Sequence, residues 1–107
     1  MALIDGSLAL LLSTPVEHAN LDTMLGLSRA ALDAGLVVHV YLIDAGVTAL
    51  TEPRVRELNA RGVRLYACAY GCRKHRVALD DPENVTYCGL VTLAELIRRT
   101  DRFVALN

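Results

Sequence analysis

Residues 7–13 read SLALLLS and residues 36–43 read LVVHVYLI, and these two stretches decide the fold class. Both are apolar runs with little polar alternation, which is typical of β-strands that are covered on both faces. Between them, residues 19–34 carry a helical stripe, followed by Gly35 at the position of a C-terminal cap. The stripe consists of Leu21, Met24, Leu25, Ser28 and Leu32. The sequence therefore predicts a strand, a helix and a second strand, with a loop at residues 14–18.

The same alternation continues to the end of the chain. After a loop or short turn at residues 45–50, Thr51 and Pro53 predict the start of a helix that runs to Asn59. Thr92 and Glu95 have the spacing of a capping box for a helix over residues 93–99. Further strands are predicted at residues 63–67, 85–88 and 102–106, with a short helix after Cys68 and a loop at residues 80–84.

Strands that alternate with helices predict one α/β domain over residues 1–107. We expect a flavodoxin-like, three-layer domain with a five-stranded, mainly parallel sheet. The simplest strand order is 2-1-3-4-5, which places the topological switch point between the first and third strands. In that order, the loop at residues 13–18 and the segment at residues 68–72 meet at one crevice.

The composition excludes several classes of protein. The chain has 107 residues, a net charge of −1 and only 5% aromatic residues, so we expect no direct binding of nucleic acid. Residues 1–5 lack the basic start of a secretory signal, and the apolar run at residues 8–12 is too short to span a bilayer. We therefore expect a cytoplasmic protein without a membrane partner. A hydrophobic content of 53% favours an oligomer that covers part of the surface.

The candidate chemistry lies in residues 62–76, which read GVRLYACAYGCRKHR. This segment puts Cys68 where an apolar strand ends and a helix begins, with a basic run close behind it. Positive charge and a helix N-terminus stabilise the thiolate, which is the reactive form of cysteine. Three cysteines, two of them close together, do not resemble the disulfide framework of a secreted protein. Cys68 is therefore the predicted reactive residue.

Cys72 is a candidate second thiol. The C-x3-C spacing puts Cys68 and Cys72 on one face of a helix, with Cα atoms at a separation that a disulfide accepts. The alternative interpretation is that Cys72 packs in the core, as cysteine commonly does. A zinc site has weak support, because only Cys88 and three histidines remain as further ligands.

Other polar residues have a structural and a functional interpretation. Arg73, Lys74, His75 and Arg76 either hold an anion or form a solvated helix face. His18 lies on the loop that the expected strand order brings towards Cys68, although most loop histidines are inert. His39 is expected in the core or at an interface, and Cys88 is expected to be buried, although it shares the carboxyl edge of the sheet with Cys68. The first strand–helix loop contains no glycine, so neither a Rossmann fingerprint nor a P-loop is present.

Over nearly its whole length, the chain resembles the DsrE/DsrF family of small sulfur-trafficking proteins, which includes the TusD-like sulfur carriers. The resemblance rests on Ile43-Asp44-Ala45-Gly46-Val47, on the strand at residues 62–68, and on the closing segments at residues 91–96 and 101–106. Many relatives carry a glycine where this chain has Arg76. The resemblance implies that Cys68 accepts sulfur as a persulfide, and Cys72 falls where some relatives carry a further cysteine.

That resemblance implies a sulfur carrier, or sulfurtransferase, that works with donor and acceptor proteins and needs neither a metal nor a cofactor. It also implies a homo- or hetero-oligomer, commonly a trimer or a hexamer. Two alternatives remain open at this point. One is a non-catalytic subunit of a sulfur-relay hetero-oligomer, and the other is a thiol–disulfide switch that uses Cys68 and Cys72.

Overall fold

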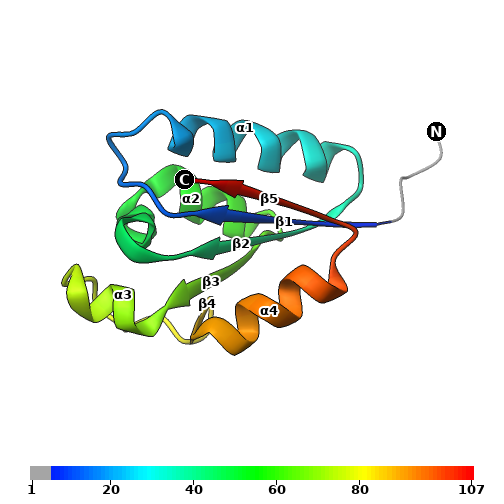
Figure 1. The fold of residues 1–107 in the computed structure, drawn as a ribbon. Coiled ribbons are helices and arrows are strands. Elements are labelled where there is room, and N and C mark those ends of the chain that lie inside the picture. The colour runs from blue at the N-terminus through cyan, green and yellow to red at the C-terminus, as the bar shows by residue number, and fades with distance from the viewer. Residues whose placement is uncertain (1–5) are drawn as a thin grey trace.

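Five parallel strands form one sheet in the computed structural model, which describes residues 6–107 (Figure 1). The strands are β1 (Ser7–Leu12), β2 (Val37–Leu42), β3 (Arg64–Cys68), β4 (Val85–Cys88) and β5 (Arg102–Leu106). The helices are α1 (Asn20–Asp33), the 3₁₀ helix η1 (Asp44–Thr51), α2 (Pro53–Ala60), α3 (Ala69–Lys74) and α4 (Leu90–Arg99). The predicted α/β class and the five parallel strands are confirmed. Our interpretation of residues 1–5 falls outside the described residues.

The order of the strands in the sheet is β4-β3-β2-β1-β5. It differs from the expected 2-1-3-4-5 because β2, and not β1, lies next to β3. The burial of the strands gives the physical reason. Most residues of β1 and β2 are buried, so these strands take inner positions, whereas β4 and β5 are more exposed and form the two edges.

The helices divide unequally between the two faces of this sheet (Figure 1). The larger core joins one face of the sheet to α1, η1 and α2, through residues such as Met24, Val47 and Leu58. A smaller core on the other face joins Leu11, Tyr41 and Phe103 to Leu96 of α4. In Figure 1, α1 lies above the sheet and α4 below it. The three layers that the sequence predicts are therefore present.

The switch point follows from this arrangement. The connections from β1 to β4 always step in the same direction, whereas α4 leads the chain back across the sheet to β5. Right-handed crossovers in opposite directions leave a sheet on opposite faces. The chain therefore diverges after β3 and β4, and the crevice lies beyond the carboxyl ends of these two strands. The expectation of a crevice between the first and third strands is wrong, because β2 separates β1 from β3.

The sequence signals for the starts of helices predicted the structure less well than the apolar runs predicted the strands. Residues 45–50, expected as a loop or short turn, belong to η1, and Thr51 donates a hydrogen bond to the Thr48 carbonyl instead of capping α2. The predicted capping box is also absent, because α4 begins earlier, at Leu90, with Gly89 at its N-cap. By contrast, Gly35 follows the end of α1 with a φ of 85°, as expected for a C-terminal cap.

A close approach of two backbone segments connects η1 to the end of β1. Ile43 donates a hydrogen bond to the carbonyl of Leu12, and Gly46 donates one to the carbonyl of Ile43. A Cβ atom at Gly46 would stand 2.0 Å from the carbonyl oxygen of Leu12. Because that oxygen belongs to the backbone of a central strand, it cannot move aside without displacing β1.

We therefore predict that Gly46→Ala lowers the free energy of unfolding by about 3 kcal/mol, as overpacking against backbone does. The matched control is Gly26→Ala within α1, where a Cβ would meet nothing within 4 Å. This control should raise stability by about 0.5–1 kcal/mol, because alanine favours a helix over glycine. Urea unfolding monitored by circular dichroism measures both changes. Equal stability of the two variants would contradict the close approach.

Candidate functional site

Cys68 is the last residue of β3 and the N-cap of α3. Its Sγ atom accepts a hydrogen bond from the backbone N–H of Gly71 at 3.4 Å. The residue is half-buried and not in a disulfide. The Cys68 sulfur therefore lies beside a backbone N–H donor at the start of α3.

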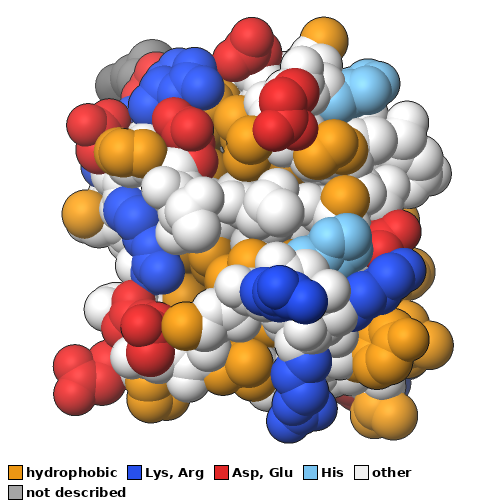
Figure 2. Space-filling model, turned by 90° about the vertical axis from the view of Figure 1, so that its left-hand side faces the viewer, with side chains coloured by type: hydrophobic (Ala, Val, Ile, Leu, Met, Phe, Trp, Pro, Cys, Tyr) orange, Lys and Arg blue, Asp and Glu red, His pale blue; other side chains and the backbone are white. Residues whose placement is uncertain are grey.

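A largely apolar pocket of about 480 Å³ opens beside Cys68. It is lined by Ile43, Asp44, Cys68, Tyr70, Gly71, Lys74, Gly89 and Leu90. Two of its apolar side chains are well exposed, with 72% of Tyr70 and 67% of Leu90 accessible to solvent. Figure 2 looks onto the end of the molecule where the strands finish, and there hydrophobic side chains lie beside basic ones. The Cys68 thiol therefore lies beside apolar side chains that are exposed to solvent in the isolated chain.

Contacts with η1 hold α3 in place. Asp44 accepts hydrogen bonds from His75 at 3.0 Å and from Lys74 at 3.4 Å, and these two contacts lower the pKa of the Asp44 carboxyl. A Cβ at Gly71 would lie 3.2 Å from the Asp44 nitrogen, so glycine allows the close packing of α3 on η1. Two members of the predicted basic run therefore anchor the helix that begins at Cys68.

Cys72 does not line the apolar pocket. Its side chain is 0% exposed and belongs to the larger core, together with Ala67 and Leu65. Burial raises the pKa of the Cys72 thiol, and the nearby Cys68 raises it further. The residue is therefore near Cys68 in the chain, but it faces the core and not the solvent.

Cys88 is the neighbour of Cys68 in the sheet. It ends β4, and the parallel register of β3 and β4 pairs Cys68 directly with Cys88. Both residues pack with the smaller core on the α4 face. Burial raises the pKa of the Cys88 thiol, while hydrogen bonds with the Thr92 and Tyr41 side chains oppose that effect. Sequence reasoning placed Cys88 at the same edge of the sheet as Cys68, but only the register of β3 and β4 shows that the two residues face each other.

His18 and His39 do not join this site. The prediction for His18 assumed that the loop after β1 faces Cys68, but β2 lies between β1 and β3. The Nδ1 atom of His18 instead accepts a hydrogen bond from the backbone of Asn20. His39 is half-buried and its Nδ1 lies 3.0 Å from the Tyr66 hydroxyl. Burial lowers the pKa of His39, and the positive charges of Arg64 and Arg99 lower it further.

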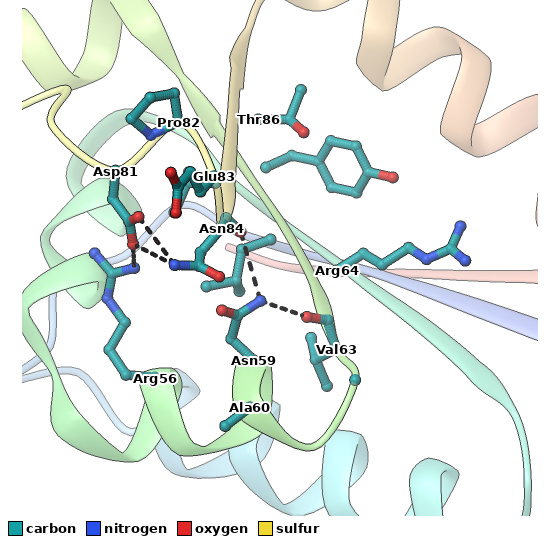
Figure 3. Close-up of a pocket in the computed structure, with 14 residues that line it drawn as sticks. Arg56, Asn59, Ala60, Val63, Arg64, Asp81, Pro82, Glu83, Asn84 and Thr86 are labelled. Atoms are coloured by element: carbon teal, nitrogen blue, oxygen red, sulfur yellow. Dashed lines mark hydrogen bonds and ion pairs between the residues drawn. The ribbon is translucent and has the colours of Figure 1, made fainter.

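A cavity of about 760 Å³ lies away from the thiols, where β3 begins (Figure 3). Arg56 of α2 contacts Asp81 at 2.7 Å, and Asp81 also accepts hydrogen bonds from Asn84. Asn59 donates to the carbonyl of Val63 at 2.9 Å. These polar contacts tie α2 to the loop before β4, so we assign this region a structural role.

Within residues 6–107, no group of three histidine, cysteine, aspartate or glutamate side chains is arranged to hold a metal ion. None of the helices in this range is long and apolar enough to cross a membrane.

Arg76 ends α3 in a conformation that favours glycine. Its φ is 57°, in the left-handed region. Around it, the Val77 N–H donates to the Cys72 carbonyl at 2.8 Å, and the Arg76 N–H donates to the Arg73 carbonyl at 3.3 Å. These two bonds form a Schellman motif, in which glycine is the usual residue at this position. The loop therefore keeps a left-handed turn with arginine at the position that this conformation usually gives to glycine.

Comparisons with known proteins agree with the sequence resemblance. Residues 7–106 match the model of the DsrE/DsrF-like family. The fold is similar to the crystal structure of the YchN protein from E. coli, with a TM-score of 0.79, 18% identity, and 94% of this chain and 99% of that chain covered. It is also similar to a conserved protein of unknown function from Bacteroides thetaiotaomicron, with a TM-score of 0.74, 15% identity, and coverage of 94% and 95%. No curated protein gives a match.

The strained position of Arg76 leads to a prediction. We expect Arg76→Gly to raise the free energy of unfolding by about 1 kcal/mol, because glycine adopts the left-handed conformation without a steric penalty. The control is Arg73→Gly inside α3, which should lower it by about 1 kcal/mol. Chemical denaturation measures both values. A loss of stability in Arg76→Gly would show that the arginine side chain contributes more than the turn costs.

Proposed function

Because the chain belongs to the DsrE/DsrF-like family, we propose that it is a cytoplasmic sulfur carrier that holds sulfane sulfur as a persulfide on Cys68. Family membership supports a role related to sulfur relay in general. The finer assignment to Cys68 rests on one observation. Of the three thiols, this one combines partial exposure, a backbone N–H donor and a place in the wall of the apolar pocket.

The proposed reaction is an exchange between thiolates and persulfides. The Cys68 thiolate attacks the outer sulfur of a donor persulfide, the S–S bond of the donor breaks, and the donor cysteine leaves as a thiolate. In the second half of the cycle, the thiolate of an acceptor attacks the outer sulfur on Cys68 in the same way, and Cys68 returns to a thiolate. No electrons enter or leave the cycle, so the exchange requires an accessible thiolate and neither metal nor cofactor.

Within this proposal, the Gly71 N–H is the group that supports the reacting sulfur. It already contacts Sγ, so it can stabilise negative charge on Cys68 before the attack and after sulfur transfer. The participation of Cys72 stays a prediction. Its complete burial weighs against contact with a donor protein and is more consistent with packing under α3.

Donor and acceptor proteins are the proposed partners, and the apolar rim of the pocket is their docking surface. We define this rim as Tyr70 and Leu90, whose side chains are 72% and 67% exposed. Lys74 lies in the wall of the same pocket and adds positive charge. An apolar patch edged by charge is typical of a protein interface. We further propose that residues 1–107 form one domain that assembles as a homo- or hetero-oligomer, either a trimer or a hexamer.

The first functional prediction concerns the persulfide itself. Incubation with inorganic polysulfide should add the mass of one or more sulfur atoms to the wild-type chain, and dithiothreitol should remove it. Cys68→Ser should lose this gain, whereas the matched variant Cys88→Ser should retain it. Intact-protein mass spectrometry measures the adduct. Absence of any sulfur gain in the wild-type chain would sink the carrier proposal and favour a non-catalytic subunit.

A second prediction separates docking from chemistry. Replacement of Tyr70 and Leu90 by serine should slow sulfur transfer from a persulfidated donor protein by about tenfold, because exposed aromatic and aliphatic anchors contribute most to such contacts. Labelling by inorganic polysulfide should stay at the wild-type rate. The control is Leu27→Ser on α1, an exposed leucine outside the pocket. Equal transfer rates in all three proteins would show that donors dock elsewhere.

A further inference from the structure

We propose that Cys88 is the second thiol of this site and that it discharges the Cys68 persulfide by forming a Cys68–Cys88 disulfide. This inference rests on the proposed function, because it describes what happens to the persulfide when no acceptor is bound. It assigns to Cys88 the resolving role that the spacing along the chain suggested for Cys72.

The register of the sheet carries the proposal. Cys68 and Cys88 are the last residues of two neighbouring parallel strands, and they face each other directly in the ladder. Neighbouring strands lie about 4.8 Å apart, which falls within the range of about 4.4–6.8 Å for the Cα atoms of a disulfide. Because both residues stand at strand ends, closing the bond requires no change inside the sheet.

The two side chains also point to the same face. Alternate residues of a strand face opposite sides of a sheet. In β3, Leu65 and Ala67 contact the larger core, while Tyr66 and Cys68 contact the smaller one. In β4, Tyr87 packs on the larger core and Cys88 on the smaller one. The thiols are therefore neighbours on the α4 face, at the crevice where the chain diverges.

Polar groups around Cys88 suit a reacting sulfur. Its thiol donates to the Thr86 carbonyl at 3.5 Å and contacts the Ala67 carbonyl at 3.9 Å, and the Tyr41 hydroxyl donates to the Gly89 carbonyl at 2.9 Å. The contact with Ala67 holds the Cys88 sulfur beside β3, the strand that ends at Cys68. Because burial raises the pKa of Cys88, this residue is largely a protonated thiol at neutral pH. It can therefore supply the proton that the leaving sulfur requires.

The step is balanced without an external oxidant. The proton of Cys88 passes to the outer sulfur of the Cys68 persulfide, and the Cys88 thiolate attacks Sγ of Cys68. The bond between Sγ and the outer sulfur breaks, and hydrosulfide leaves. The outer sulfur is reduced to sulfide, while the two cysteine sulfurs are oxidised to a disulfide. A thiol reductant, such as a dithiol, returns the pair to its starting state.

Cys72 is less suited to this step despite its short spacing from Cys68. Its side chain is fully buried in the larger core, whereas Cys68 packs on the opposite face. A disulfide with Cys72 would require one of the two side chains to leave its core. The Cys88 pairing keeps both side chains on the face that they already occupy.

The test follows the persulfide after its formation. Wild-type protein, Cys88→Ser and Cys72→Ala are loaded with inorganic polysulfide, desalted and followed by intact mass and by sulfide release. We expect the wild-type adduct to convert into a form two hydrogens lighter than the reduced chain, with one sulfide released per chain. Peptide mapping without reduction should join Cys68 to Cys88. Cys72→Ala should behave as the wild type, and Cys88→Ser should keep its adduct at least about tenfold longer.

Two results would overturn the proposal. One is an adduct that lasts as long in the wild type as in Cys88→Ser, and the other is a disulfide that joins Cys68 to Cys72. A second arm treats the unloaded protein with oxidised glutathione, so that the pairing is tested without a persulfide. If the wild type gains no sulfur but forms the Cys68–Cys88 disulfide here, the carrier function fails and the thiol pair stands. If no Cys68–Cys88 disulfide forms in either arm, the proposed pairing of these two thiols is wrong.

Discussion

The return of the chain from β4 across the sheet to β5 is the constraint on which the candidate site depends. Because this crossover runs opposite to the earlier ones, α4 covers a different face from α1 and α2. The segments that follow β3 and β4 therefore leave towards opposite faces of the sheet. The space between the carboxyl ends of these two strands stays open. Cys68 and Cys88 occupy those two ends in direct register. In the expected order 2-1-3-4-5 the same two strands would be neighbours, but the crevice would lie between β1 and β3 and not at Cys88.

Close backbone packing gives the reacting sulfur a fixed position. Gly46 allows η1 to approach the end of β1, and Gly71 allows α3 to approach η1. Asp44 then holds the end of α3 through Lys74 and His75. As a result, the N–H of Gly71 points at the sulfur of Cys68, while the apolar rim beside it stays exposed. Backbone contacts thus hold the Cys68 sulfur in place, while the apolar rim beside it is available to a partner protein.

The sequence predicted the elements well and their arrangement less well. Apolar runs of strand length at residues 7–13 and 36–43 need burial on both faces, so their place in a parallel sheet could be predicted. The strand order could not, because each crossover can step in either direction and only the relative burial of whole strands decides between them. The capping signals at Thr51 and Thr92 failed for a related reason, since packing of the flanking residues moved the helix starts. Cys68 could be singled out from its local context alone. The expected order already paired the strands that end at Cys68 and Cys88, but their register joins residues 20 positions apart, and no local pattern reports it.

The central claim is that one thiol faces partners, one lies beside it at the crevice and one belongs to the core. The rates at which iodoacetamide alkylates the three cysteines in the folded, reduced protein test this claim most directly, when peptide mass mapping follows each site. Our account predicts that Cys68 reacts first, Cys88 more slowly, and Cys72 only when the protein unfolds in denaturant. Alkylation of Cys72 at the rate of Cys68 in the folded protein would contradict it.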